Sequence, residues 1–304
     1  MDARLHDLPF DPAALRGLSP RLMSSHHQNN YGGAVKRLNA IRAQLAATTF
    51  GSAPGFQLNG LKREELIASN SMLLHELYFA SLGGDGQAME PACALALSAS
   101  FGSVERWREE FTACAKALGG GSGWMLLVFN PREGTLVNQW SADHAHALAG
   151  GTPLLALDMY EHAYHLDFGA NAAAYVDACL AAIDWAGVYA RYKTAVHAAS
   201  EGFGAEQGDI ANSLVLDVRR AGVFEIATTL LPGAAWRDPA DVAQWATDLP
   251  HDRPVTVYCV YGHEVGRATA MRLRAVGVDA RYLIGGIDGW SNAGMPVEPR
   301  GQRP

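Results

Sequence analysis

The sequence has little charge, few cysteines and no long hydrophobic run. Only 18% of its 304 residues are charged, and 24 basic against 31 acidic residues leave a formal net charge of −7, which argues against a nucleic-acid partner. The four cysteines form no Cys-x-x-Cys pair, which argues against a zinc ribbon or a disulfide-stapled fold. No apolar stretch reaches the roughly 20 residues that cross a bilayer, and the first residues lack the apolar core of a secretion signal. We therefore expect a cytoplasmic protein with no nucleic-acid and no membrane partner.

A hydrophobic fraction of 49% is that of a globular protein, and 304 residues predict two domains. Before residue 200 a helical period dominates, and it is interrupted near Gly187 and by three short extended runs. Ser103 is positioned to cap one of the helices. Helices followed by a small antiparallel sheet predict an α+β domain over residues 1–197. The expected helices are 31–45, 62–82, 104–118 and 171–197, and the expected strands are 124–129, 135–140 and 153–157.

The pattern changes after residue 197. Residues 198–208 are small, acidic and rich in glycine, which predicts a linker. Beyond them, apolar runs alternate with helical segments, which predicts a small α/β domain with a parallel sheet over residues 209–304. The expected strands are 213–216, 255–258 and 280–283, and the expected helices are 238–247 and 263–276.

Three histidines and one aspartate are candidates for a metal site. Asp158 and His162 are four residues apart and face the same side if the chain turns helically there. His26 begins the first long helix, and His75 lies within the second. A lone histidine is more often an ordinary core or surface residue. Three imidazoles with one carboxylate, however, suit iron or manganese, and they would also take zinc.

These residues lie in motifs through which residues 8–197 resemble the iron/manganese superoxide dismutases. The resemblance implies a helical hairpin over 1–88 and an α/β half over 89–197. It also implies one iron or manganese ion per chain, bound by His26, His75, Asp158 and His162, and conversion of superoxide to dioxygen and hydrogen peroxide. The motifs are LPF at 8–10, HHQNNYGGAVKRLN at 26–39, SNSMLLHELYF at 69–79, GSGW at 121–124, TPLLALDMYEHAY at 152–164 and IDWAGVYARY at 183–192.

The surroundings of the implied ion differ from the family pattern. Trp124 is retained, but other positions carry different side chains, which alters the path of protons and anions and leaves the ion's ligands intact. Two hypotheses follow: an active dismutase, or a metal-binding paralogue with little dismutase activity that acts as a redox sensor or scaffold. The replacements are Asn30 for a channel histidine, Ala34 for a gateway tyrosine, Leu126 for a second tryptophan, Tyr160 for a tryptophan and His165 for a tyrosine that reaches across the dimer.

Two further positions near the implied ion matter for its solvent ligand and its partner chain. The glutamine of the iron type falls at Ser71, which is too short to replace it, so the catalytic solvent-bonding role falls to His144, with His146 as the other candidate. The family's equivalent of Glu161 reaches a ligand histidine of the partner subunit, which implies a homodimer through the first domain.

Cys259 is the candidate nucleophile of the second domain. It follows the apolar run 255–258 and precedes a helix, so backbone N–H groups and the helix dipole favour its thiolate. Residues 209–304 resemble a rhodanese-like sulfurtransferase domain, which implies that Cys259 accepts sulfane sulfur from a donor and passes it to an acceptor. The motifs are LVLDVRR at 214–220, LPGAAW at 231–236, VYCVYGHEV at 257–265 and YLIGGIDGWSNAGMPVE at 282–298.

The active-site loop of this second domain also departs from its family. Glu264 stands where many members carry an arginine, which predicts weaker affinity for dianions such as thiosulfate and a less depressed pKa of Cys259. Asp217 and Arg219 are expected to form a structural pair that positions the loop. The alternative is a non-catalytic module that binds partners.

Overall fold

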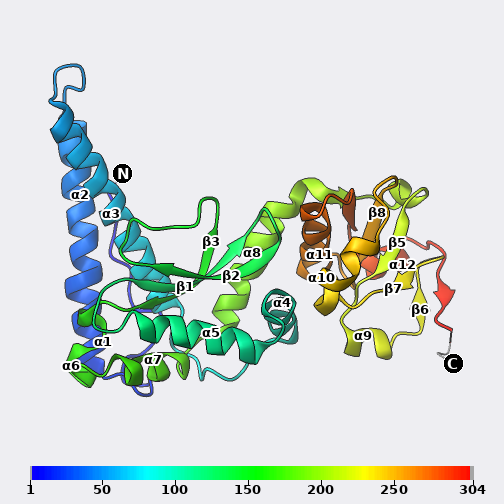
Figure 1. The fold of residues 1–304 in the computed structure, drawn as a ribbon, viewed down its shortest axis with the longest axis horizontal. Helices are drawn as coiled ribbons and strands as arrows, with labels where there is room; N and C mark the ends of the chain where they lie inside the picture. Colours follow the sequence, from blue (N-terminus) through cyan, green and yellow to red (C-terminus); the bar gives the residue numbers. More distant parts are fainter. Residues whose placement is uncertain (1, 302–304) are drawn as a thin grey trace.

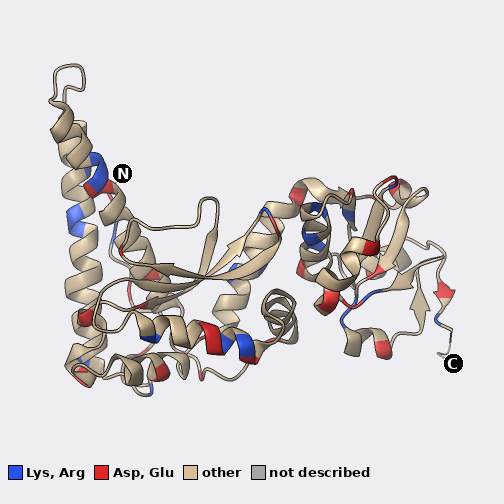
Figure 2. Ribbon diagram, in the orientation of Figure 1, with Lys and Arg blue, Asp and Glu red and all other residues tan. Residues whose placement is uncertain are grey.

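The computed structural model describes residues 2–301. Figure 1 shows two bodies side by side, which we call the N-terminal part (residues 2–200) and the C-terminal part (residues 201–301). Acidic and basic residues are mixed along both (Figure 2). Within the described residues, no helix combines the length and the apolar character needed to span a membrane.

The N-terminal part begins with the predicted helical hairpin. Its two long helices pack against each other through Leu38, Ile41 and Ala68, which are buried because apolar residues recur on one face of each helix. The helix predicted at 31–45 is preceded by a π-helical turn, and the helix predicted at 62–82 begins one to two turns earlier. The elements are α1 (Pro20–Ser25), η1 (His26–Tyr31), α2 (Gly32–Ala46) and α3 (Gly55–Ala80).

The remainder of the N-terminal part is an antiparallel sheet of order β2-β1-β3 with helices packed against it. The central strand β1 is buried almost throughout because the sheet is covered by α5 and α8. Ser103 caps α5 as predicted, its Oγ accepting the N–H of Arg106 at 3.0 Å. The elements are α4 (Pro91–Phe101), α5 (Val104–Ala117), β1 (Trp124–Asn130), β2 (Thr135–Ser141), β3 (Thr152–Asp158), η2 (Glu161–Ala163), α6 (His165–Phe168), α7 (Ala172–Leu180) and α8 (Trp185–Ser200).

The C-terminal part is built on a parallel sheet of order β4-β9-β8-β5-β7, as the strand and helix alternation predicts. The strands are β4 (Gly204–Ala205), β5 (Leu214–Asp217), β7 (Ala235–Trp236), β8 (Val255–Tyr258) and β9 (Ala280–Leu283), with a separate ribbon of β6 (Thr229–Leu230) and β10 (Glu298–Pro299). The helices are η3 (Glu201–Phe203), η4 (Gln207–Ile210), α9 (Ala221–Glu225), η5 (Pro239–Asp241), α10 (Val242–Trp245), η6 (Ala246–Asp248), α11 (Glu264–Ala275) and α12 (Gly286–Asn292).

Two local features differ from the expectations. Residues 198–208, predicted as a linker, contain the end of α8, η3 and the edge strand β4, which pairs with β9. Their small residues serve close packing, since a Cβ on Gly204 would lie 2.8 Å from Cδ1 of Ile284. The helical break predicted at Gly187 falls instead between α7 and α8, and Gly187 sits inside α8, where a Cβ would lie 2.5 Å from Oδ2 of Asp184.

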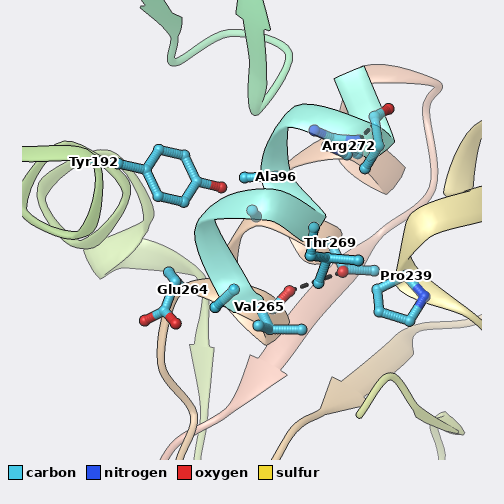
Figure 3. A pocket seen from close by; sticks show the side chains of 11 residues that line it. Ala96, Tyr192, Pro239, Glu264, Val265, Thr269 and Arg272 are labelled. Carbon is cyan, nitrogen blue, oxygen red and sulfur yellow. Dashed lines mark hydrogen bonds between the residues drawn. The ribbon is translucent and has the colours of Figure 1, made fainter. Parts of the chain in front are cut away.

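The two parts are joined by an interface between α8 and α4 on one side and α11 and η5 on the other. Arg272 of α11 is 8% exposed, and its guanidinium donates hydrogen bonds to the carbonyls of Gly134 (3.0 Å) and Ala99 (2.8 Å) and to Ser100 Oγ (2.8 Å). Figure 3 shows Arg272, Thr269 and Val265 of α11 in this interface, with Tyr192 of α8 opposite. The C-terminal part is therefore held against the N-terminal part by buried contacts in addition to the chain connection.

Candidate metal centre and thiol site

Four side chains from four elements meet at one point in the N-terminal part. His26 comes from η1, His75 from α3, Asp158 from the end of β3 and His162 from η2, and one ligand atom of each lies within 4.8 Å of all the others. Oδ2 of Asp158 is 3.0 Å from Nε2 of His26, 3.2 Å from that of His162 and 3.4 Å from that of His75. The structure thus brings together the residues that the sequence motifs select.

Local structure orients each of these groups. Nδ1 of His75 bonds the carbonyl of Ser71 at 2.6 Å, so Nδ1 carries the hydrogen and Nε2 faces the cluster as a lone pair. Oδ1 of Asp158 accepts the N–H of Tyr160 at 2.9 Å, which leaves Oδ2 for the imidazoles. The π-helical turn η1 places His26 in the core, where it is 0% exposed; such turns are frequent at functional sites.

The electrostatics of the cluster suit a cation. Burial lowers the pKa of His75 to about 3 and also lowers the pKa of His26. Burial alone would raise the pKa of Asp158, but its contacts with His162 and His26 hold that pKa below its usual range. Neutral imidazoles around a charged carboxylate are the protonation states that metal binding requires. Within residues 2–301, Nε2 of His75 is buried without a hydrogen-bond partner, a costly arrangement that a bound ion would relieve.

His144 stands beside this cluster, whereas His146 does not. The indole N–H of Trp124 donates to Nδ1 of His144 at 3.0 Å, and the His144 ring stacks on Tyr160 with centroids 4.9 Å apart. Burial lowers the pKa of His144 and raises that of Tyr160 to about 12. The side chain of His146 is 53% exposed and lies near Asp143. Of the two candidates for solvent bonding, only His144 borders the site.

A cavity of about 330 Å³ opens onto the cluster. His75, His144 and His162 are among the residues that line it. Asn30, Ala34 and Ser71, three of the positions at which the sequence departs from the family pattern, also line it, together with Asn29, Gly33, Arg37, Ile67 and Ala68. Two of the four cluster residues, His75 and His162, therefore border a cavity whose other lining residues are small or polar except for Ile67.

Other predicted residues lie outside this cavity, and some site residues were not predicted. Glu161 and His165 are exposed at the starts of η2 and α6. The hydroxyl of Tyr175 donates to the main-chain carbonyl of Asp158 at 2.8 Å and accepts from the hydroxyl of Tyr78 at 3.2 Å. Sequence reasoning missed both tyrosines because an aromatic residue at helical spacing is more often an ordinary core residue.

Cys259 directly follows β8 in the C-terminal part and is 6% exposed. The backbone N–H groups of Gly266, His263 and Gly262 surround its sulfur and lower its pKa, but burial has the larger effect and raises it. The prediction of a favoured thiolate was correct about these N–H groups and wrong about the net direction. Gly262 must be glycine, because its φ is +68° and a Cβ there would lie 2.6 Å from the carbonyl oxygen of Leu283.

The predicted pair of Asp217 and Arg219 forms beside this loop. Nε of Arg219 donates to both carboxylate oxygens at 3.0 and 2.9 Å, and Tyr258 Oη donates to Oδ2 of Asp217 at 3.0 Å. A cavity of about 240 Å³ lies against Cys259. It is lined by Arg219, Arg220, Val223, Val260, Tyr261, His263, Glu264 and Val265, and also by Glu90, Ala92 and Tyr189 of the N-terminal part.

Comparisons with known proteins match each part of the chain to one family. Residues 89–191 match the family model of the iron/manganese superoxide dismutases, C-terminal domain, and residues 203–293 match that of the rhodanese-like domain. A relative from Cupriavidus metallidurans, "Superoxide dismutase [Fe]", is 64% identical over 189 residues, which cover 62% of this chain and 95% of the relative. "Superoxide dismutase [Mn] 1" of Halobacterium salinarum is 36% identical over 196 residues, covering 60% of this chain and 90% of the relative.

Proposed function

The chain belongs to the iron/manganese superoxide dismutase family, and on this premise we propose that it converts superoxide to dioxygen and hydrogen peroxide at the cluster of His26, His75, Asp158 and His162. The convergence of one ligand atom from each residue within 4.8 Å carries the proposal. Relatives named for iron and for manganese support either ion as the cofactor. The bound ion supplies the redox chemistry by alternating between its divalent and trivalent states.

The residues around the ion hold charge and protons in the arrangement that this reaction needs. The one carboxylate of the cluster brings a negative charge to the ion, which favours its trivalent state. Because an indole N–H can only donate, Nδ1 of His144 must accept from Trp124, and a neutral His144 therefore carries its hydrogen on Nε2. His144 lines the cavity beside His75 and His162, which supports His144 as the residue that bonds the catalytic water and replaces the family's glutamine.

Activity per bound ion tests this proposal. We expect iron-loaded or manganese-loaded protein to disproportionate superoxide, and His144→Ala to keep its ion but lose about 10²-fold in rate, the range of a lost proton donor. His146→Ala is the matched control, because the exposed ring of His146 lies outside the cavity, and its rate should be unchanged. An ion-loaded wild type without dismutation would contradict the proposal and favour the redox sensor or scaffold.

We also propose that the protein is a homodimer through its first domain, residues 1–197. Glu161 and His165 are exposed although they flank the ligand His162 in sequence, and a second copy seated there would cover them. Sedimentation velocity at micromolar concentration should give the dimer mass, and Glu161→Ala should shift the protein toward the monomer. A wild-type monomer under these conditions would contradict this part of the proposal.

For the second domain, residues 209–304, we propose that Cys259 carries sulfane sulfur as a persulfide. Support comes from the rhodanese-like match over residues 203–293, the N–H groups around the sulfur and the adjoining cavity of about 240 Å³. Cyanide should release sulfur from the loaded wild type but not from Cys259→Ser. Cys114→Ser is the control, since Cys114 lies on α5, far along the chain from this loop. Loss of sulfur only in the Cys114 variant would contradict the assignment.

A further inference from the structure

The cavity at Cys259 is formed by both parts of the chain. Glu90, Ala92 and Tyr189 of the N-terminal part line it together with the loop that holds Cys259. The buried contacts of Arg272 fix this arrangement, as does Gly134, whose φ of +65° lets the turn approach α11 so closely that a Cβ would lie 2.7 Å from Cβ of Met271. The N-terminal part is therefore a fixed wall of the thiol site.

One contact across this interface reaches the loop directly. Tyr189 of α8 donates its hydroxyl hydrogen to Oε1 of Glu264 at 2.6 Å. Glu264 is the first residue of α11 and is 7% exposed. Burial and this hydrogen bond to the carboxylate raise the pKa of Tyr189 above its usual value, so the hydroxyl remains a donor. A carboxylate can accept about four hydrogen bonds, and Tyr189 uses one of them.

Glu264 lacks a cationic partner in the described part of the chain. None of the ion pairs within residues 2–301 includes Glu264 or Glu90. Arg219 is engaged by Asp217, and Arg267 bonds the carbonyl of Gly262 and stacks on Tyr282. A buried carboxylate without a cation is costly, and a ligand that brings a positive group into the cavity would offset this cost.

We propose that the two parts form one sulfur-transfer site, in which Tyr189 positions Glu264 so that the pocket of Cys259 selects a donor with an ammonium group, an amino-acid persulfide, over a small dianion. The inference rests on the proposed sulfur transfer to Cys259. The ammonium group would pair with Glu264 and Glu90, and Arg220 on the same cavity wall would receive the donor's carboxylate. Thiosulfate offers two negative charges to the same walls and no positive one.

The transfer balances without an external oxidant or reductant. The sulfur of Cys259 attacks the outer sulfur of the donor R–S–SH and forms a new S–S bond. The S–S bond of the donor breaks, and its electron pair stays on R–S. The proton lost by the Cys259 thiol goes to this leaving group, which departs as R–SH. The sulfane sulfur changes partners, and no sulfur is oxidised or reduced overall.

Donor discrimination by the full-length protein tests the inference. Sulfur loading, measured as cyanide-releasable sulfur, is followed with cysteine persulfide, with N-acetylcysteine persulfide, which lacks the ammonium charge, and with thiosulfate. We expect kcat/KM of the wild type to favour cysteine persulfide over the acetylated donor by about tenfold, the scale of one close charge pair. Glu264→Gln and Tyr189→Phe should both reduce this ratio toward one and increase the relative rate with thiosulfate.

Tyr192→Phe is the matched control, because it removes the same hydroxyl from the next turn of α8, in the interface but outside this cavity. It should keep the wild-type ratio, whereas a merely structural role of the interface would change all three variants alike. If the wild type and Glu264→Gln showed the same ratio of kcat/KM between the two persulfide donors and loaded sulfur normally, the inference would be overturned while the proposed sulfur transfer would stand. Absence of sulfur on the wild type from every donor would overturn both the proposed sulfur transfer and this inference.

Discussion

Replacing Arg272 with methionine tests whether the two parts of the chain unfold as one unit. Arg272→Met keeps the volume of the side chain in the interface but removes the donors to Gly134, Ala99 and Ser100. Two carbonyls are then left buried without their donor, at about 1–3 kcal/mol each, and burying the guanidinium no longer costs its desolvation. We expect the free energy of unfolding to fall by about 3 kcal/mol, almost all of it because contacts in the interface are lost.

Calorimetry of the full chain measures this loss. We expect a single cooperative transition for the wild type and an earlier, separate transition of the C-terminal part for Arg272→Met. Arg274→Met is the matched control, since Arg274 lies on the same helix but bonds Asp279 and the carbonyl of Ala280 within its own part. If Arg272→Met melted like the wild type, the interface would contribute no stability and the fixed wall of the thiol site would be refuted.

Three further predictions concern stability. Gly134→Ala should cost about 1–3 kcal/mol more than Gly150→Ala in thermal melts, because both glycines have positive φ but only Gly134 faces close atoms; equal costs would contradict the close packing. Ser103→Ala should lose about 1 kcal/mol of its helix cap in urea unfolding, and no loss would refute the cap. The metal-free protein should lose stability as pH falls from 6.5 toward 3, by up to about 1.4 kcal/mol per pH unit, because the folded-state pKa of His75 is about 3 and the unfolded chain binds that proton first. Stability that rises on acidification over this range would contradict it.

Several elements with a clear helical period or with a short continuous apolar run were located from the sequence. Apolar spacing located α2, α3 and α5, and continuous apolar runs located β8 and β9. The helix α4 was missed because PACALALSASF is small and apolar on all sides and shows no stripe. The glycine-rich composition of residues 198–208 predicted a linker. Small residues are favoured both in flexible segments and in closely packed ones, so composition alone did not distinguish the two.

The sites divide in a similar way. Local motifs selected His75 and Asp158 as candidate ligands, since each belongs to a recognisable stretch of sequence, and the structure brings both into one cluster. The interface contacts of Arg272 and Tyr189 could not be found, because nothing near them in the sequence shows which surfaces will meet. The N–H groups around Cys259 could be expected from a strand followed by a loop and a helix, but the depth of its burial depends on the whole fold.

Elemental analysis of the purified full-length protein tests the central claim, that three imidazoles and one carboxylate bind a single ion. The account predicts one iron or manganese ion per chain in the wild type and in His146→Ala, and loss of that ion in His75→Ala, which removes the unpartnered Nε2. Wild-type protein that takes up neither ion on reconstitution, or a His75→Ala variant that binds as much as the wild type, would contradict it.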